Sequence, residues 1–179
     1  AFVVIVGDGN LFPYFVKDNE VSDNFYTEIV GNDEVPDIIL GKISAENATH
    51  VTTQVNKFIQ YEENPEQTSH FATFLGIASS EGPGEDNEYD YEHIRNIDNK
   101  LQAFTYTNGY ELFDGSQGGL DASGNTTAAN VSTAVHAGVG IITYCGHGSE
   151  TSWGTTSFSN SHINILTNYF KLPFIISTA

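Results

Sequence analysis

The sequence predicts an α/β fold in which helices cover both faces of a mainly parallel sheet. Six apolar runs rich in β-branched residues recur along the 179 residues, and patterns with helical spacing lie between several of them. Strands that are apolar at nearly every position are typical of a sheet that is covered on both faces. The length suits one sizeable core, so we expect a single α/β domain over residues 1–179, arranged as a three-layer sandwich.

The predicted strands are bounded by Gly, Pro, Asn or Asp. They cover residues 2–6, 38–43, 71–78, 110–113, 139–144 and 173–177. The first run, in AFVVIVGDG, reads as a buried strand that is entered without a lead-in, and no signal peptide precedes it. We therefore expect this chain to be a piece cut from a longer one.

Four helices are predicted between these strands. The first two carry apolar residues three or four positions apart, at Val51, Val55, Phe58 and Ile59 and at Ile94, Ile97, Leu101 and Phe104. A third fits residues 126–137, with Asn125 as its N-cap and Gly138 at the left-handed position after its end. A shorter one fits residues 160–169. The segments 82–90 and 114–125 read as loops that are either functional or disordered.

Composition excludes several classes of partner. The formal charge of −17 would repel a phosphate backbone, so we expect no nucleic-acid partner. Apolar runs are far shorter than the roughly 20 residues that cross a bilayer, so we expect no membrane span. A single cysteine, Cys145, excludes an internal disulfide framework. The carboxylates are solvated or, in part, ligands for a hard cation such as calcium.

Ligands and catalytic groups of open α/β sheets collect beyond the carboxyl ends of the strands. That rule selects Asp8, Glu81, His147 and whatever follows Ala179. Asp8 is better read as a residue of a structural turn, or as facing a cation, than as part of a phosphate-binding loop, because the GxGxxG spacing is absent.

His147 is the most informative of these residues, because an apolar strand ends in a histidine between two glycines. The glycines leave the imidazole uncrowded and the Gly148 N–H free to donate to a substrate carbonyl oxygen. His147 is therefore a candidate general base, the alternative being a surface histidine in a loop. Cys145 continues the buried strand, and we expect it to be a packing residue rather than the nucleophile. Trp153 is expected to shape the wall beside His147.

Several segments resemble the gingipain family of cysteine peptidases, and more closely its arginine-directed members. They are VGD at 6–8, SDNFYTEIVGND at 22–33, GKISAE at 41–46, ASSEG at 78–82, GHGSETSWGT at 146–155 and LTNYFKLPFI at 166–175. The resemblance covers nearly the whole chain in order and implies a caspase-like fold. It also implies a secreted or cell-surface bacterial enzyme that is made as a zymogen and needs no organic cofactor.

The same resemblance assigns roles to individual residues. It implies that His147 is the catalytic imidazole, that Glu81 orients it, and that Asp90 lies at the base of a pocket for the substrate arginine. An aspartate can accept two parallel hydrogen bonds from a guanidinium, which a lysine ammonium cannot offer. The alternatives are a solvated loop residue for Glu81 and a charge that complements a helix N-terminus for Asp90.

Two further implications concern groups that accompany the chain. The family resemblance suggests a structural calcium ion held by Asp86, Asn87 and Glu88. It also places the nucleophilic cysteine directly after the position of Ala179, so we expect this chain alone to be inactive. The cysteine would lie in the rest of the same polypeptide or in a companion chain.

Two other functions stay open from the residues alone. One is a non-catalytic module of the same fold that binds basic peptides in an acidic cleft. The other is a metal-dependent hydrolase that uses Asp8, Glu81 and His147 at one sheet edge. The natural substrate, the strictness of arginine over lysine and the oligomeric state are not determined by the sequence.

Overall fold

The computed structural model describes residues 1–17, 20–31, 33, 35–84 and 87–179, which form two compact units. The first unit is Ala1–Pro65 and the second is Glu66–Ala179. The expectation of a single catalytic-type domain over the whole chain stays a prediction.

The first unit contains two small sheets and one long helix. Strands β1 (Phe2–Val6) and β4 (Ile39–Ile43) pair in parallel, as their apolar runs predict. The antiparallel pair β2 (Phe15–Lys17) and β3 (Glu20–Ser22), which precedes the 3₁₀ turn Asn24–Tyr26, was not predicted, because each strand has only three residues. Helix α1 (Ala48–Glu63) begins after Asn47, whose side chain accepts a hydrogen bond from the His50 N–H.

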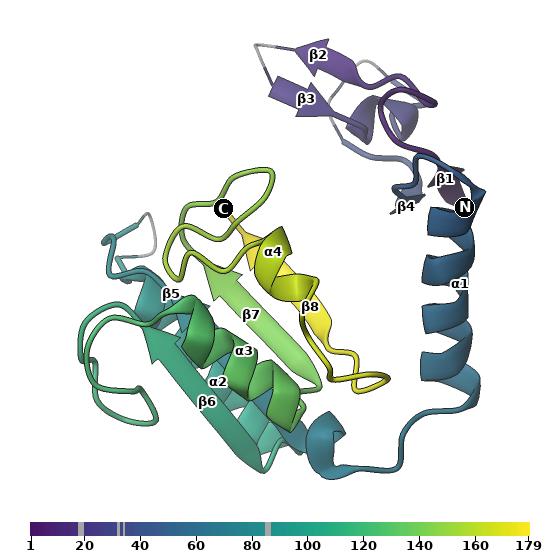
Figure 1. Ribbon diagram of the computed structural model, residues 1–179. Helices are drawn as coiled ribbons and strands as arrows, with labels where there is room; N and C mark the ends of the chain where they lie inside the picture. Colours follow the sequence, from purple (N-terminus) through teal and green to yellow (C-terminus); the bar gives the residue numbers. More distant parts are fainter. Residues whose placement is uncertain (18–19, 32, 34, 85–86) are drawn as a thin grey trace. The chain divides into compact units, whose positions relative to one another are not determined.

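The second unit is built on a four-stranded parallel sheet with the order β6-β5-β7-β8 (Figure 1). Its strands are β5 (Thr73–Ala78), β6 (Asn108–Phe113), β7 (Ile141–Cys145) and β8 (Phe174–Thr178). All six predicted strands are thus present, but they form two separate parallel sheets instead of one. Strand β5 begins two residues later than predicted, because residues Ser69–Ala72 form a 3₁₀ turn.

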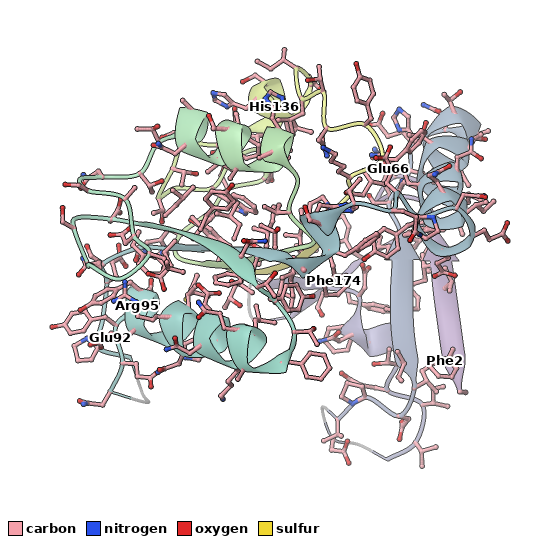
Figure 2. All side chains as sticks on the ribbon, turned by 90° about the horizontal axis from the view of Figure 1, so that it is seen from below. Phe2, Glu66, Glu92, Arg95, His136 and Phe174 are labelled. Atoms are coloured by element: carbon pink, nitrogen blue, oxygen red, sulfur yellow. The ribbon has the colours of Figure 1, made fainter. Side chains whose placement is uncertain are left out.

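Helices lie on both faces of this sheet, as Figures 1 and 2 show. Helix α2 (Asp90–Phe104) covers one face, and α3 (Ala128–Ala137) and α4 (Asn160–Ile163) lie on the other. Side chains of β5 pack into a hydrophobic cluster on each face of the sheet. Leu75 and Ile77 pack on the α3 side, whereas Ala78 packs with Ile94 of α2. This confirms the predicted α/β sandwich.

A glycine in the middle of β5 lets α2 approach the sheet closely. A Cβ atom at Gly76 would lie 2.7 Å from Ile94 Cγ2 and would overlap the Asp98 carboxylate. Both Ile94 and Asp98 are buried residues of α2. The helix therefore rests directly on the backbone of the central strand.

Two helix boundaries differ from those predicted. Thr127, not Asn125, is the N-cap of α3, because its hydroxyl accepts from the Asn130 N–H; the Asn125 side chain accepts from Gly115 N instead. Gly138 follows α3 with a φ of 102°, as its placement predicts. Helix α4 ends at Ile163 rather than Tyr169. Beyond it Ile165 N and Leu166 N donate to the residues three positions back, and the Thr167 N–H donates to His136 Nε2.

In the described part of the chain, none of the helices combines the length and the apolar character that crossing a lipid bilayer requires.

Candidate active site

The carboxyl ends of β5 and β7 bring a histidine and a glutamate together. The two strands are neighbours, with Ala78 opposite Cys145, so the residues that follow them leave the sheet side by side. His147 Nε2 lies 3.0 Å from Glu81 Oε2, and both side chains are largely exposed, at 82% and 63%. An exposed pair of this kind is accessible to a substrate.

The backbone of His147 is fixed by groups on both sides of its loop. Its carbonyl oxygen accepts hydrogen bonds from the Tyr144 hydroxyl at 2.6 Å and from Gly154 N at 2.7 Å. A Cβ atom at Gly154 would lie 2.7 Å from that same oxygen, so the second bond requires glycine. Tyr144 is buried in the core and thus ties the imidazole-bearing loop to the sheet.

The N–H of Gly148 is the candidate oxyanion donor. Gly148 faces Trp153 in a short antiparallel bridge, whose hydrogen bonds are made by the flanking residues: Gly154 N donates to His147 O and Ser149 N to Ser152 O. Within the described residues no hydrogen bond uses the Gly148 N–H, and the residue is exposed. This donor is therefore available to a ligand.

Strand β8 ends at the same edge of the sheet as His147 and Gly148. It runs parallel to β7, with Thr178 opposite Cys145, and its Thr178 carbonyl accepts from Gly146 N at 3.2 Å. A Cβ atom at Gly148 would lie 3.1 Å from the Ala179 Cβ, so Ala179 contacts the residue that follows His147. The end of β8, the imidazole and the candidate oxyanion donor thus share one sheet edge.

Trp153 lies on the β8 side of this edge. Its ring stacks on Tyr144, with centroids 4.8 Å apart and planes 8° apart, and its Nε1 donates to Ser177 Oγ at 3.2 Å. The ring is half-buried, and the next residue bonds to the His147 carbonyl. The position agrees with a wall beside the imidazole, whereas a role in substrate binding stays a prediction.

Asp90 and Glu81 are joined through Ser79, which the sequence did not identify. The Ser79 hydroxyl donates to Asp90 Oδ2 at 2.5 Å and accepts from Glu81 N at 3.0 Å, and Asp90 N donates to Glu81 O at 3.0 Å. Asp90 is the first residue of α2, so its charge also complements the helix dipole. In the sequence, Ser79 is only a serine two residues before Glu81, and no motif separates it from other loop serines.

A third carboxyl group lies near Glu81. Asp114 follows β6, and its N–H donates to Ala78 O at 3.0 Å. Burial, and then the charge of Glu81, raise the pKa of Asp114 above its ordinary value. The sheet edge is therefore strongly acidic, which favours a cationic ligand.

Two residues selected from the sequence have structural roles. Cys145, the last residue of β7, is half-buried and packs against the cluster of Ala78, Ile94 and Phe113, as a packing residue would. Asp8 belongs to the first unit and forms a turn, in which its Oδ1 accepts from Asn10 N at 3.0 Å and its carbonyl accepts from Leu11 N and Phe12 N.

The predicted calcium ligands are only partly described. Asp86 lies outside the described residues. Asn87 has a φ of 62°, and Glu88 accepts from Asn96 Nδ2 at 2.7 Å and lies 3.3 Å from His93 Nδ1. Over residues 1–17, 20–31, 33, 35–84 and 87–179, no three His, Cys, Asp or Glu side chains gather in a way that would hold a metal ion. The calcium site stays a prediction.

The chain is similar to known peptidases over its full length. It is 35% identical over 182 residues to Gingipain R2 of Porphyromonas gingivalis, covering all of this chain and 24% of that protein. Lys-gingipain of the same species is 26% identical over 180 residues, with 96% of this chain and 10% of that protein covered.

Solved structures agree with these relatives. The crystal structure of the Arg-specific cysteine proteinase gingipain R (RgpB) superposes with a TM-score of 0.86 at 33% identity, covering 98% of this chain and 40% of that one. The complex of Porphyromonas gingivalis RgpB pro- and mature domains gives a TM-score of 0.87 at 33% identity, with 98% and 41% covered. The caspase-like architecture implied by the sequence is thus confirmed.

This chain therefore spans about a quarter of the length of Gingipain R2 and about two fifths of the solved gingipain R chain. The family model of peptidase family C25 matches residues 1–179. The full-length match, together with the paired histidine and glutamate at the sheet edge, shows that this chain belongs to peptidase family C25.

Proposed function

We propose that the full-length protein is a secreted or surface-exposed bacterial cysteine endopeptidase that hydrolyses peptide bonds after arginine. The observation that carries this proposal is the 3.0 Å approach of His147 Nε2 to Glu81 Oε2 at the sheet edge where β8 ends. The similarity to arginine-specific gingipain R over the whole chain supports the same assignment. Proteins and peptides with arginine at P1 are the substrates.

The imidazole of His147 serves as the proton carrier. When Glu81 accepts a hydrogen bond from the Nε2–H, the neutral ring has an unprotonated Nδ1 that can take the proton of a thiol. The glutamate then stabilises the imidazolium that forms. The same Nδ1–H later protonates the amine that leaves the scissile bond.

The nucleophile in this proposal is a cysteine directly after Ala179, carried by the rest of the polypeptide or by a companion chain. Its support is the contact of Ala179 with Gly148, one residue from the imidazole. The thiolate adds to the scissile carbonyl carbon, and the Gly148 N–H donates to the resulting oxyanion, a contact that is typically worth roughly 10² to 10³ in rate. Loss of the amine gives a thioester, which water hydrolyses.

Asp90 is the proposed partner of the substrate arginine. One of its oxygens accepts from Ser79, while among the described residues no hydrogen bond uses Oδ1, which together with a remaining lone pair of Oδ2 can face a guanidinium. Trp153, stacked on Tyr144, provides an apolar wall at the same edge. The proposed chemistry uses these residues and no organic cofactor.

Covalent labelling of the full-length protein tests the proposal. An arginyl chloromethyl ketone should alkylate a cysteine, and mass spectrometry of the digested protein should place the label on the residue after Ala179. The Cys145→Ser variant should label at the wild-type rate, because Cys145 packs against α2. The His147→Ala variant should label more slowly by about 10² or more.

Three other outcomes of these experiments would contradict the proposal. A label on Cys145 would overturn the assignment of the nucleophile. No label, with retained binding of arginine peptides, would indicate the non-catalytic module. Hydrolysis that is lost with a chelator and kept after alkylation would indicate the metal-dependent hydrolase.

A further inference from the structure

We infer that Ser79 is a positioning residue that makes the pocket of Asp90 selective for arginine over lysine. This inference rests on the proposed function. It concerns three residues that we call the Ser79 clamp: Ser79, Glu81 and Asp90.

The direction of the hydrogen bonds in the clamp is fixed by chemistry. The Glu81 N–H can only donate, so the Ser79 oxygen accepts, and the Ser79 proton must then go to Asp90 Oδ2. The O–H···O distance of 2.5 Å lies at the short end of the range for hydrogen bonds to a carboxylate. Ser79 is 5% exposed, so water does not readily replace this bond.

The clamp also holds the two acidic residues at a set separation. Asp90 N donates to Glu81 O, which closes a ring of hydrogen bonds through Ser79. Ser79 N donates to Cys145 O, two residues before His147. The acid that binds the substrate and the acid that supports the imidazole are thus attached to one buried serine between β5 and β7.

This geometry affects arginine and lysine differently. A guanidinium is a planar fork, and its two parallel hydrogen bonds require the carboxylate plane to have one orientation. A lysine ammonium is a compact charge that needs proximity but no common plane. Because Ser79 fixes Oδ2, it fixes the carboxylate plane, so its removal should weaken arginine recognition more than lysine recognition.

The test compares Ser79→Ala with wild type in the full-length enzyme, on two peptides that differ only in arginine or lysine at P1. We expect kcat/KM for the arginine peptide to fall about tenfold, mainly through KM, because a hydrogen bond to a charged group is lost. The lysine peptide should change by about twofold or less. Ser79→Thr, which keeps the hydroxyl, should keep the arginine-to-lysine ratio of wild type within about twofold.

Two controls isolate the clamp. Ser80→Ala makes the same change at the exposed neighbouring residue and should alter neither constant by more than about twofold. In an Asp90→Asn background, Ser79→Ala should add less than about twofold, since the carboxylate that it orients is gone. Thermal unfolding of each variant shows whether it is folded.

The outcomes separate this inference from the proposed function. Equal losses for both peptides in folded Ser79→Ala, or no loss at all, would overturn the inference while the peptidase assignment stands. If wild type hydrolyses neither peptide, the proposed function fails. In that case calorimetry gives the dissociation constants of the arginine and lysine peptides for wild type and for Ser79→Ala. If the ratio of the two constants is the same in both proteins, the inference is also overturned.

Discussion

Asp98 is a carboxyl group in the interior of the second unit. It is fully buried on α2 above Gly76, and among the described residues neither its two oxygens nor Thr143 Oγ1 has a hydrogen-bond partner. Burial first, and the negative charge of Glu111 second, raise the pKa of Asp98 from 3.8 to about 8, against an opposing effect of Arg95. Asp98 is therefore protonated in the folded protein at neutral pH.

Replacing Asp98 by Asn should stabilise the protein at and above neutral pH. Because the pKa of Asp98 is higher in the folded than in the unfolded protein, the buried carboxyl group destabilises the fold least below about pH 4. As the pH rises toward 8, the free energy of unfolding of the wild type falls by about 1.4 kcal/mol per pH unit. Asn has nearly the same shape and cannot ionise. Thermal unfolding between pH 4 and 9 should give curves that meet near pH 4 and diverge above it; parallel curves would contradict a raised pKa.

At the candidate active site, the sequence predicted Glu81 and His147 but not Ser79. Glu81 and His147 follow apolar strands, so the strand-end rule found both, and the structure brings them to 3.0 Å. Ser79 follows β5 as one serine of a Ser-Ser pair, and only the fold shows that it faces Asp90. Hydrogen bonds between residues eleven positions apart leave no trace in local spacing.

At the scale of elements, Arg95 joins α2 to the edge of the sheet and to the loop 114–125. Figure 2 shows Arg95 on α2. Its guanidinium donates to both oxygens of Glu111 on β6 and to the carbonyls of Gln117 and Gly118 in the loop. Within the loop, Asp121 accepts from Phe113 N and Gln117 N. The loop, which composition left open as ordered or disordered, is thus held at several points.

Arg95→Met should release this loop and destabilise the second unit. Glu111 is 4% exposed on its side chain, and removing its partner leaves a buried charge, at a cost of about 3 kcal/mol. Urea unfolding should show that loss, and hydrogen exchange should rise at residues 114–125. Lys100→Met, on the exposed surface of the same helix, should change neither; a loss of similar size in both variants would mean that the contacts of Arg95 are not its cause.

Long elements were predictable and short ones were not. The parallel strands and the helices α1, α2 and α3 carry apolar residues in runs or at helical spacing, which the sequence displays, although α1, β1 and β8 leave most of theirs exposed. The β2 and β3 pair is too short for a period, and the helix of α4 does not continue because the Thr167 N–H donates to His136 Nε2. The division of the six strands into two sheets depends on pairing, which periodicity does not specify.

At the scale of the whole chain, the formal charge of −17 should attract basic peptides. If the full-length protein is the proposed peptidase, we expect its kcat/KM on an arginine peptide with basic flanking residues to fall several-fold between about 0.02 M and about 0.5 M salt. A peptide with the same arginine and acidic flanks should lose less or gain. Equal salt dependence for both peptides would show that long-range attraction does not contribute.

The contact of α2 with Gly76 links the centre of the sheet to the Ser79 clamp. Asp90 begins the helix that rests on this glycine, and Ser79, the residue directly after β5, donates its hydroxyl proton to Asp90. A methyl group at residue 76 would raise the helix and withdraw Asp90 from Ser79, with no substitution at either position. In this protein the absence of a side chain at residue 76 therefore keeps the start of α2 within hydrogen-bond reach of Ser79.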